Sequence, residues 1–499
     1  MRCTLARKNC LRESESLVIT SPHLKWFGLA LLSAVQFMVV LDIAVVNVAL
    51  PSIQVDLGFS QANLQWVISA YALVFGGFLL LGGRSADLLG RRRVFVLGIV
   101  VFIIGSLLCG FAWSETSLIG ARALQGLGAA AISPAALSIL MTSFKEGRDR
   151  NIALGVWGGV GGFGAAAGVL LGGVLTDALS WEWIFFVNIP VGLIALALVP
   201  LLLGESRDSR VRSFDMPGAV LVTAGLSTLV LAITQGHVWG WSSGRTIGVF
   251  VAAAALLAGF VSWENRTAEP LMRFAILRTK TVLGANVAGF ILGTALFSMF
   301  LMLTLYMQQV LHYSPMKTGV AYLAVAGTSI IWANVAAALV GKVGVRPLIA
   351  TGMGLLAVGM LYFTRIDVGG TYLTALLPGF LIIAVGMAMC FVPISIAALA
   401  GVGREEAGLA SGLINTTQQI GGAVGIALLS TIAITRTDNK LAVGTAVPDA
   451  MVAGFQLAFL VGAAIAAAGL VAALLLIRDE ELTVGPQPEP EPEQVLDPV

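Results

Sequence analysis

The sequence predicts an all-α protein that crosses a membrane many times. Of its 499 residues, 58% are hydrophobic and only 11% are charged. Apolar runs of about 17 to 25 residues, the length that an α-helix needs to cross a bilayer, recur along nearly the whole chain. The connections between these runs alternate between rich and poor in Arg and Lys. Together, these observations indicate a polytopic membrane protein.

Each apolar run is expected to form one transmembrane helix, which gives fourteen helices. Their predicted starts lie near Trp26, Leu64, Val94, Leu118, Ile152, Trp183, Met216, Thr246, Val282, Val320, Pro347, Tyr372, Ala407 and Met451. The first run is too long for the apolar part of a signal peptide, so we expect an uncleaved N-terminus.

The basic residues set the expected orientation. One set of connections carries Arg84, Arg91, Arg92, Arg93, Lys145, Arg148, Arg150, Arg207, Arg210, Arg212, Arg266, Arg273, Arg278, Lys280, Lys342, Arg346 and Arg404. The opposite set carries Arg245, Lys317, Arg365, Arg436 and Lys440. By the positive-inside rule the first set and both termini face the cytoplasm, which predicts a multi-pass protein of the inner (cytoplasmic) membrane.

A weak internal repeat indicates the domain organisation. The stretch LVGKVGVRP from Leu339 resembles the charged stretch GGRSADLLGRRRVF from Gly82, and each lies between two predicted spans. Internal repeats around a central site are typical of transporters. We therefore expect two six-helix bundles at 26–204 and 281–477, with two inserted helices at 205–280. A cytoplasmic tail is expected at 1–25, and a disordered acidic, Pro-rich cytoplasmic tail at 478–499.

The charged stretch also carries a family resemblance. Gly83, Arg84, Asp87, Gly90 and the run Arg91, Arg92 and Arg93 resemble the signature of the major facilitator superfamily between its second and third helices. Further stretches agree with this family: LDIAVVNVALP from Leu41, ARALQGLGAA from Ala121, GAAAGVLLGGVL from Gly164, WEWIFFVNIPVG from Trp181, FDMPG from Phe214 and GLASGLINTTQQIGGAVG from Gly408.

From about Trp26 to Ile477, the chain is similar to the fourteen-span drug:proton antiporters of the EmrB/QacA type. The resemblance implies the major facilitator fold, with two six-helix bundles plus two inserted helices. It also implies efflux of amphipathic drugs or antibiotics, driven by the proton gradient through alternating access.

The charged stretch is also a candidate cytoplasmic gate. Asp87 lies just beyond the second span, where it can meet the N-terminus of a helix and the cationic side chains that follow it. We interpret the stretch as a latch that holds the inward gate shut in the outward-facing state. In the alternative interpretation, its charges only anchor the turn in the cytoplasm, but an anchor needs neither Asp87 nor the glycines.

Ionisable residues inside membrane spans are costly and usually functional. Asp42 and Arg122 lie at similar depths in the first and fourth spans and within family motifs, so we predict that they couple transport to protons. The alternatives are that each only stabilises a helix contact, or that Arg122 extends to the outer interface.

Glycines line the fifth span. Gly164, Gly168, Gly172 and Gly173 give spacings that let helix backbones approach closely, and they resemble the antiporter motif of exporters. The family usually has Pro after the glycine at 168, whereas this chain has Val169, so a kink at this position is less fixed.

Polar and aromatic side chains in the spans suit an apolar cavity for amphipathic compounds. The candidate cavity residues are Tyr71, Gln125, Phe300, Tyr306, Trp332, Asn415, Gln418 and Gln419. The competing interpretation is that polar residues join helices and aromatics face lipid.

The motifs also separate classes of function. The three histidines, His23, His237 and His312, lie outside the span interiors, and no GxxxxGK[ST] phosphate loop is present, so neither an enzyme nor an ATP-driven pump is expected. No metal or cofactor is expected. The predicted partners are the lipid bilayer, a small amphipathic substrate and protons. No nucleic-acid partner is expected, and the protein is expected to be a monomer. The alternatives are a proton-coupled transporter of a metabolite or siderophore, and a non-transporting sensor.

Overall fold

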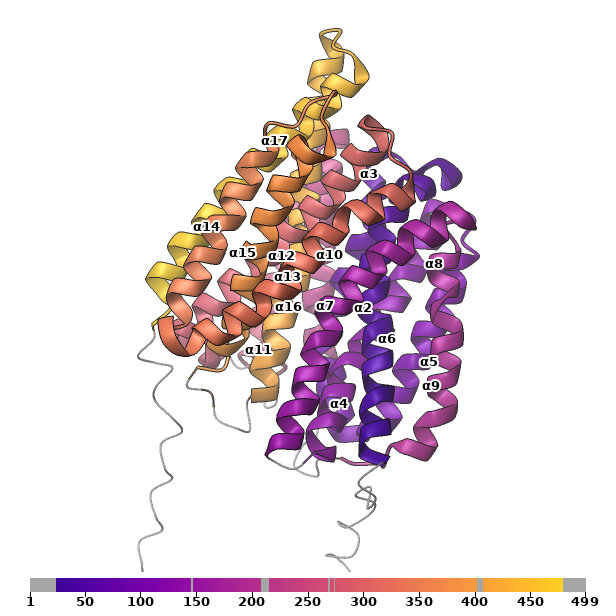
Figure 1. The fold of residues 1–499 in the computed structure, drawn as a ribbon, viewed down its shortest axis with the longest axis vertical. Coiled ribbons are helices and arrows are strands. Elements are labelled where there is room, and N and C mark those ends of the chain that lie inside the picture. Colours follow the sequence, from indigo (N-terminus) through magenta and orange to yellow (C-terminus); the bar gives the residue numbers. More distant parts are fainter. Residues whose placement is uncertain are drawn as a thin grey trace, which may run out of the picture.

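The computed structural model describes residues 24–144, 147–207, 215–267, 270–272, 274–400, 402 and 407–478. The described part is helical, with long, roughly parallel helices and no strand (Figure 1). The predicted tails lie outside it except for their innermost residues, Leu24, Lys25 and Arg478.

The first part of the chain forms helices that pack around one another. They are α2 (Leu24–Leu57), the short α3 (Gln61–Leu64), α4 (Trp66–Leu89), α5 (Arg91–Gly110), α6 (Glu115–Ser143), α7 (Arg148–Ala178), the short α8 (Trp183–Phe186) and α9 (Asn188–Leu202). Two further helices follow, α10 (Met216–Trp239) and α11 (Gly244–Glu264).

The last part of the chain forms a second group of helices. They are η1 (Phe274–Arg278), α12 (Lys280–Leu305), η2 (Tyr306–Val310), α13 (Pro315–Val343), α14 (Val345–Phe363), η3 (Tyr372–Leu376), α15 (Leu377–Ala397), α16 (Ala407–Ala442) and α17 (Val447–Leu476).

The helices fit the predicted number of membrane spans. Thirteen helices in the described ranges are long and apolar enough to cross a membrane. Helix α7 has 31 residues, about 46 Å at 1.5 Å per residue, and brings the long helices to fourteen. All-α architecture and multiple membrane spans are therefore confirmed.

Polar side chains cap the N-termini of several helices at the turns between spans. The Ser114 hydroxyl accepts a hydrogen bond from the Ser117 backbone N–H, and the Ser117 hydroxyl accepts one from the Ser114 backbone N–H. This capping box begins α6. Ser60, Ser243 and Ser314 cap the N-termini of α3, α11 and α13, and the side chain of each accepts one hydrogen bond from a backbone N–H group. These caps satisfy backbone N–H groups that a membrane helix leaves open at its ends.

The two ends of the bundle differ. We call the end with Leu24, Gly90 and Leu476 the terminal end, and the end with Gly58 and Gly240 the distal end. Near the distal end, helices α7 and α13 touch, because a Cβ on Gly173 would lie 2.6 Å from the Pro315 carbonyl oxygen. Toward the terminal end, a Cβ on Gly155 of α7 or Gly341 of α13 would meet no atom within 4 Å. The close contact between the two helices therefore lies near the distal end.

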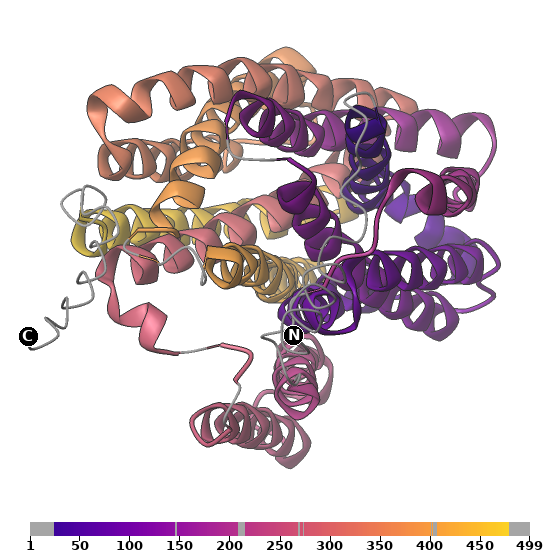
Figure 2. The same ribbon diagram turned by 90° about the horizontal axis from the view of Figure 1, so that it is seen from below.

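The helix pair α10 and α11 lies at one side of the bundle, as Figure 2 shows. Helix α10 packs against both α4 of the first group and α16 of the second. Leu73, Leu226 and Ala427 belong to one buried apolar cluster at this seam. At the distal end, His237 of α10 contacts Asp438 of α16 at 2.8 Å. The pair therefore covers the line along which the two groups of helices meet.

Candidate proton-coupling site and gate

Two buried charges form an ion pair between α2 and α6. Arg122 Nη1 lies 2.6 Å from Asp42 Oδ2, and the side chains are 1% and 0% exposed. Buried charges are tolerated when they are paired and hydrogen-bonded. The structure thus brings together the two residues that the sequence analysis singled out.

Asp42 accepts three hydrogen bonds. Besides Arg122, Gln125 Nε2 donates to Oδ1 at 2.7 Å and Asn188 Nδ2 donates to Oδ1 at 3.0 Å. Each donor is an N–H group, and an ionised carboxylate only accepts. The arrangement therefore fits the negatively charged carboxylate, held away from solvent.

Arg122 is fixed on its other sides as well. Its Nε donates to the Val67 carbonyl oxygen at 2.9 Å and its Nη1 to Gln125 Oε1 at 2.6 Å. The guanidinium carbon lies 4.4 Å from the centre of the Tyr71 ring, within cation–π range. The planar fork of an arginine can serve these separate partners at once, which a lysine ammonium cannot.

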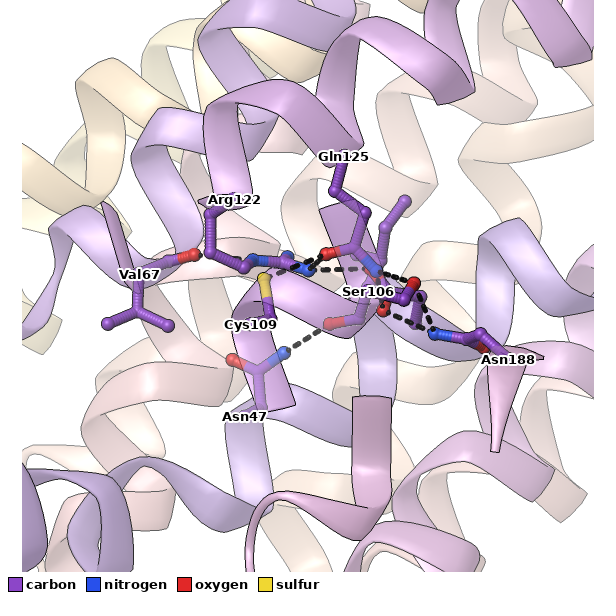
Figure 3. A network of polar contacts seen from close by, with 9 residues as sticks. Asn47, Val67, Ser106, Cys109, Arg122, Gln125 and Asn188 are labelled. Carbon is purple, nitrogen blue, oxygen red and sulfur yellow. Dashed lines mark hydrogen bonds and ion pairs between the residues drawn. The ribbon is translucent and has the colours of Figure 1, made fainter. Parts of the chain in front are cut away.

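The network reaches residues that the sequence analysis did not assign to a site (Figure 3). Ser106 Oγ accepts from Gln125 Nε2 at 2.8 Å, and Cys109 Sγ lies 3.6 Å from Gln125 Oε1. Asn188 is 146 positions from Asp42 in the sequence. It stands in the quoted stretch WEWIFFVNIPVG, which was the one available signal for it.

The predicted gate residues lie at the terminal end, between α4 and α5. Asp87 Oδ1 accepts two hydrogen bonds from Arg91, at 2.8 and 3.0 Å, and one from Ser138 of α6 at 3.5 Å. Gly83 faces Pro134 of α6, at 3.4 Å from the position of its missing Cβ. These contacts join α4, α5 and α6 within one group of helices.

Glu205, which follows α9, receives the rest of this cluster. The Arg92 backbone N–H donates to Glu205 Oε1 at 3.1 Å, and Arg93 Nε lies 3.7 Å from Oε2. Gly90 has a φ of +110°, and a Cβ there would lie 2.7 Å from Glu205 Oε1. Arg84 instead donates to the Pro270 carbonyl oxygen, in the chain after α11. The positive φ at position 90 favours a glycine there.

The predicted antiporter glycines lie where α7 packs against its neighbours. Cβ atoms on Gly164, Gly168 and Gly172 would lie 2.7 to 3.0 Å from atoms of α2. Gly173 instead faces the start of α13. The glycines therefore let α7 contact both α2 and α13 through their backbones.

The eight predicted cavity residues differ in their surroundings. Tyr71 and Gln125 belong to the Arg122 network, whereas Tyr306 is buried and donates to the Asp367 carbonyl oxygen. The others are Phe300 and Gln418, which are half-buried, Gln419, which is buried with an unpartnered Nε2, and Trp332 and Asn415, which are exposed.

A cavity of about 230 Å³ lies elsewhere, near the distal end between α3, α12, α16 and α17. Met302 and Phe455 form part of its apolar wall, and Gln65, Gln309 and Asp438 supply polar groups. None of the eight predicted cavity residues lines it.

Comparison with known proteins identifies the family. The family description "Major Facilitator Superfamily" matches residues 32–426. Puromycin resistance protein pur8 of Streptomyces alboniger is 41% identical over 91% of this chain and 92% of its own length. Cephamycin export protein CmcT of Amycolatopsis lactamdurans is 40% identical over 81% of this chain and 84% of its own length.

The fold has a counterpart among solved structures. The structure of peptide transporter POT in complex with sulfate superposes with a TM-score of 0.65, at 17% identity over 90% of this chain and 93% of that one. At this identity the likeness concerns the fold. The matched family covers most of the membrane-spanning chain, so the protein belongs to the Major Facilitator Superfamily.

Proposed function

We propose that this protein exports small amphipathic antibiotics or other drugs from the cytoplasm in exchange for protons. Support for the export of antibiotics comes from relatives, such as those named for puromycin resistance and cephamycin export, that match most of the chain. The observation that carries proton coupling is the buried Asp42–Arg122 pair with its three hydrogen bonds to the carboxylate.

The terminal end faces the cytoplasm in this proposal. Its described connections carry most of the basic residues, among them Arg91, Arg92, Arg148, Arg278 and Arg346, as the positive-inside rule requires. Both ends of the chain then lie in the cytoplasm. Because the close contact between α7 and α13 at Gly173 lies near the distal end, we assign the described conformation to an inward-facing state.

Proton transfer at Asp42 requires the network to open. The carboxylate has only donors around it, so an added proton must displace the guanidinium or an amide N–H. A displaced Arg122 would be a buried cation without a counter-ion, which is costly. Protonation therefore favours a rearrangement of α2 against α6, and this step links proton uptake to the change between outward-facing and inward-facing states.

The gate acts in the same cycle. In the described conformation Asp87 is paired with Arg91 inside its own group of helices. When the two groups close at the cytoplasmic side, this partly exposed carboxylate becomes available to the start of α16, where helix N–H groups attract negative charge. Residues 403–406, which precede α16 in the sequence, lie outside the described residues.

Two measurements test the proposal. Expression in a bacterium that lacks its own efflux pumps is expected to raise the drug concentration needed to stop growth. Purified protein in vesicles with an imposed pH gradient is expected to move the same drug, and dissipation of the gradient is expected to stop this movement. Transport that continues at the same rate without a gradient would contradict proton coupling, while the absence of any drug movement would contradict export.

A further inference from the structure

Two buried carboxylates lie together at the terminal end of the α10–α11 pair, far from the Asp42 network along the chain. Asp215 precedes α10 and is 4% exposed, while Glu264 ends α11 and is 3% exposed. Both reach the same point in space, because a Cβ on Gly218 would lie 2.5 Å from Asp215 Oδ2 and 2.8 Å from Glu264 Oε1.

The second oxygen of each carboxyl group is already bonded. Asp215 Oδ1 accepts from the Gly218 N–H at 2.9 Å and from Trp263 Nε1 at 2.7 Å. Glu264 Oε2 accepts from the Met272 N–H at 3.3 Å. The remaining two oxygens, Asp215 Oδ2 and Glu264 Oε1, are buried and have no hydrogen-bond partner among the described residues.

Two carboxylate groups whose oxygens lie this close to one point cannot both keep a negative charge in a buried site. A buried oxygen without a hydrogen-bond partner is also costly in free energy. Here Asp215 Oδ2 and Glu264 Oε1 are two such oxygens, and both lie near Gly218. A single proton removes both difficulties, because it neutralises one carboxyl group and lets its O–H donate to the other. We propose that Asp215 and Glu264 hold one shared proton, which makes a second proton-binding site separate from Asp42.

The surroundings of the pair favour a proton over a metal ion. Leu81, Ala219 and Leu271 form an apolar cluster beside it, so among the described residues few further oxygen ligands lie near the pair. Among the described residues of the neighbouring helix α4, Arg84 acts on the charge of Glu264 electrostatically. The chain that follows α11 contributes backbone groups.

The site is connected to the gate through one short segment. Glu264 accepts a hydrogen bond from the Met272 N–H, and Arg84 of the gate donates one to the Pro270 carbonyl oxygen. Loss of the shared proton leaves two carboxylates beside Arg84 and draws its guanidinium toward them. The protonation state of the pair therefore biases which group Arg84 binds at the cytoplasmic side.

The test is a pH titration of the full-length purified protein, followed by the infrared C=O band of protonated carboxyl groups. An Asp42→Asn background removes the other buried carboxyl group from the signal. We expect a band near neutral pH that disappears on alkalinisation and is absent in Glu264→Gln. The control Asp177→Asn removes an exposed carboxylate and is expected to leave the band unchanged.

Two variants test whether the proton is shared. Asp215→Asn removes the like charge and keeps an oxygen that can cap α10, so the band of Glu264 is expected to disappear at a lower pH. Arg84→Ala removes the facing cation, so the band is expected to persist to a higher pH.

Three results would overturn the proposal: a band that Glu264→Gln does not reduce, a midpoint that Asp215→Asn leaves in place, or loss of the band at neutral pH on addition of Na⁺, K⁺ or Mg²⁺. The last result would identify a cation site instead. These readouts need no drug transport, so they stand or fall independently of the export function.

Discussion

Replacement of Asp42 by Asn tests the proton-coupling site directly. The substitution keeps the size of the side chain and one oxygen acceptor, but it removes the negative charge and places an N–H₂ group among donors. Arg122, at 1% exposure, then has no charged partner within the pair. We expect Asp42→Asn to abolish drug export driven by the pH gradient while drug binding remains.

The size of the accompanying stability loss follows from the geometry. Breaking a buried ion pair by removing one partner costs about 3 to 5 kcal/mol. Because an Asn oxygen at the position of Oδ1 retains the acceptor for two of the three donors, we expect a value near the lower limit, about 3 kcal/mol. The double variant Asp42→Asn/Arg122→Gln removes both charges, so it is expected to recover part of this stability but not the transport.

The assay measures proton movement induced by substrate in vesicles that contain the purified protein. Asp56→Asn is the matched control, because Asp56 lies on the same helix, is exposed, and accepts a hydrogen bond from Trp181 at 2.9 Å. We expect wild-type proton movement in this control. Undiminished proton exchange in correctly inserted Asp42→Asn protein would refute the assignment of Asp42 as the proton carrier.

Four further outcomes are expected. Arg122→Lys is expected to insert normally but to slow drug-driven proton movement roughly tenfold, the effect of losing about one charge-assisted hydrogen bond; an unchanged rate in vesicles would show that the planar fork is dispensable. Asp87→Asn is expected to leave membrane insertion intact and strongly reduce export, and wild-type drug efflux from cells would argue against the latch. Gly173→Val is expected to reduce transport, because the added side chain meets the backbone of α13. Gly155→Val is expected to be tolerated, because a Cβ there meets no atom within 4 Å. Equal transport rates of the two variants in vesicles would contradict this packing argument. Neutral and monocationic drugs are expected to be exported better than rigid dications, because Asp42 is the one buried acidic side chain of the described residues that lies away from a helix end. Growth-inhibition tests that rank these drugs in the opposite order would reject this expectation.

Local sequence carried the span prediction. The helix starts agree with the predicted starts within a few residues, as for α10, which begins at Met216, and α2, which begins at Leu24 where Trp26 was expected. A membrane span is recognised from its own residues, because the bilayer requires about 20 consecutive apolar positions and internally satisfied backbone groups.

Packing decided which polar residues meet. Gln125 was predicted to line a substrate cavity, yet it bonds Asp42, Arg122 and Ser106. An amide in an apolar run is compatible with either role, and its partners come from helices that are distant in the sequence. Periodicity and composition cannot choose between these roles because they carry no information on which helices are neighbours.

By itself, the sequence determined the all-helical membrane architecture and the position of the charged turn. It also singled out Asp42 and Arg122 as the candidate coupling residues. These follow from local hydropathy and from the high cost of charges within a bilayer. Only the tertiary structure decided that Asn188 and Ser106 complete this network, and that Asp215 and Glu264 meet beside Gly218. Such contacts depend on the packing of helices that are separate in the sequence.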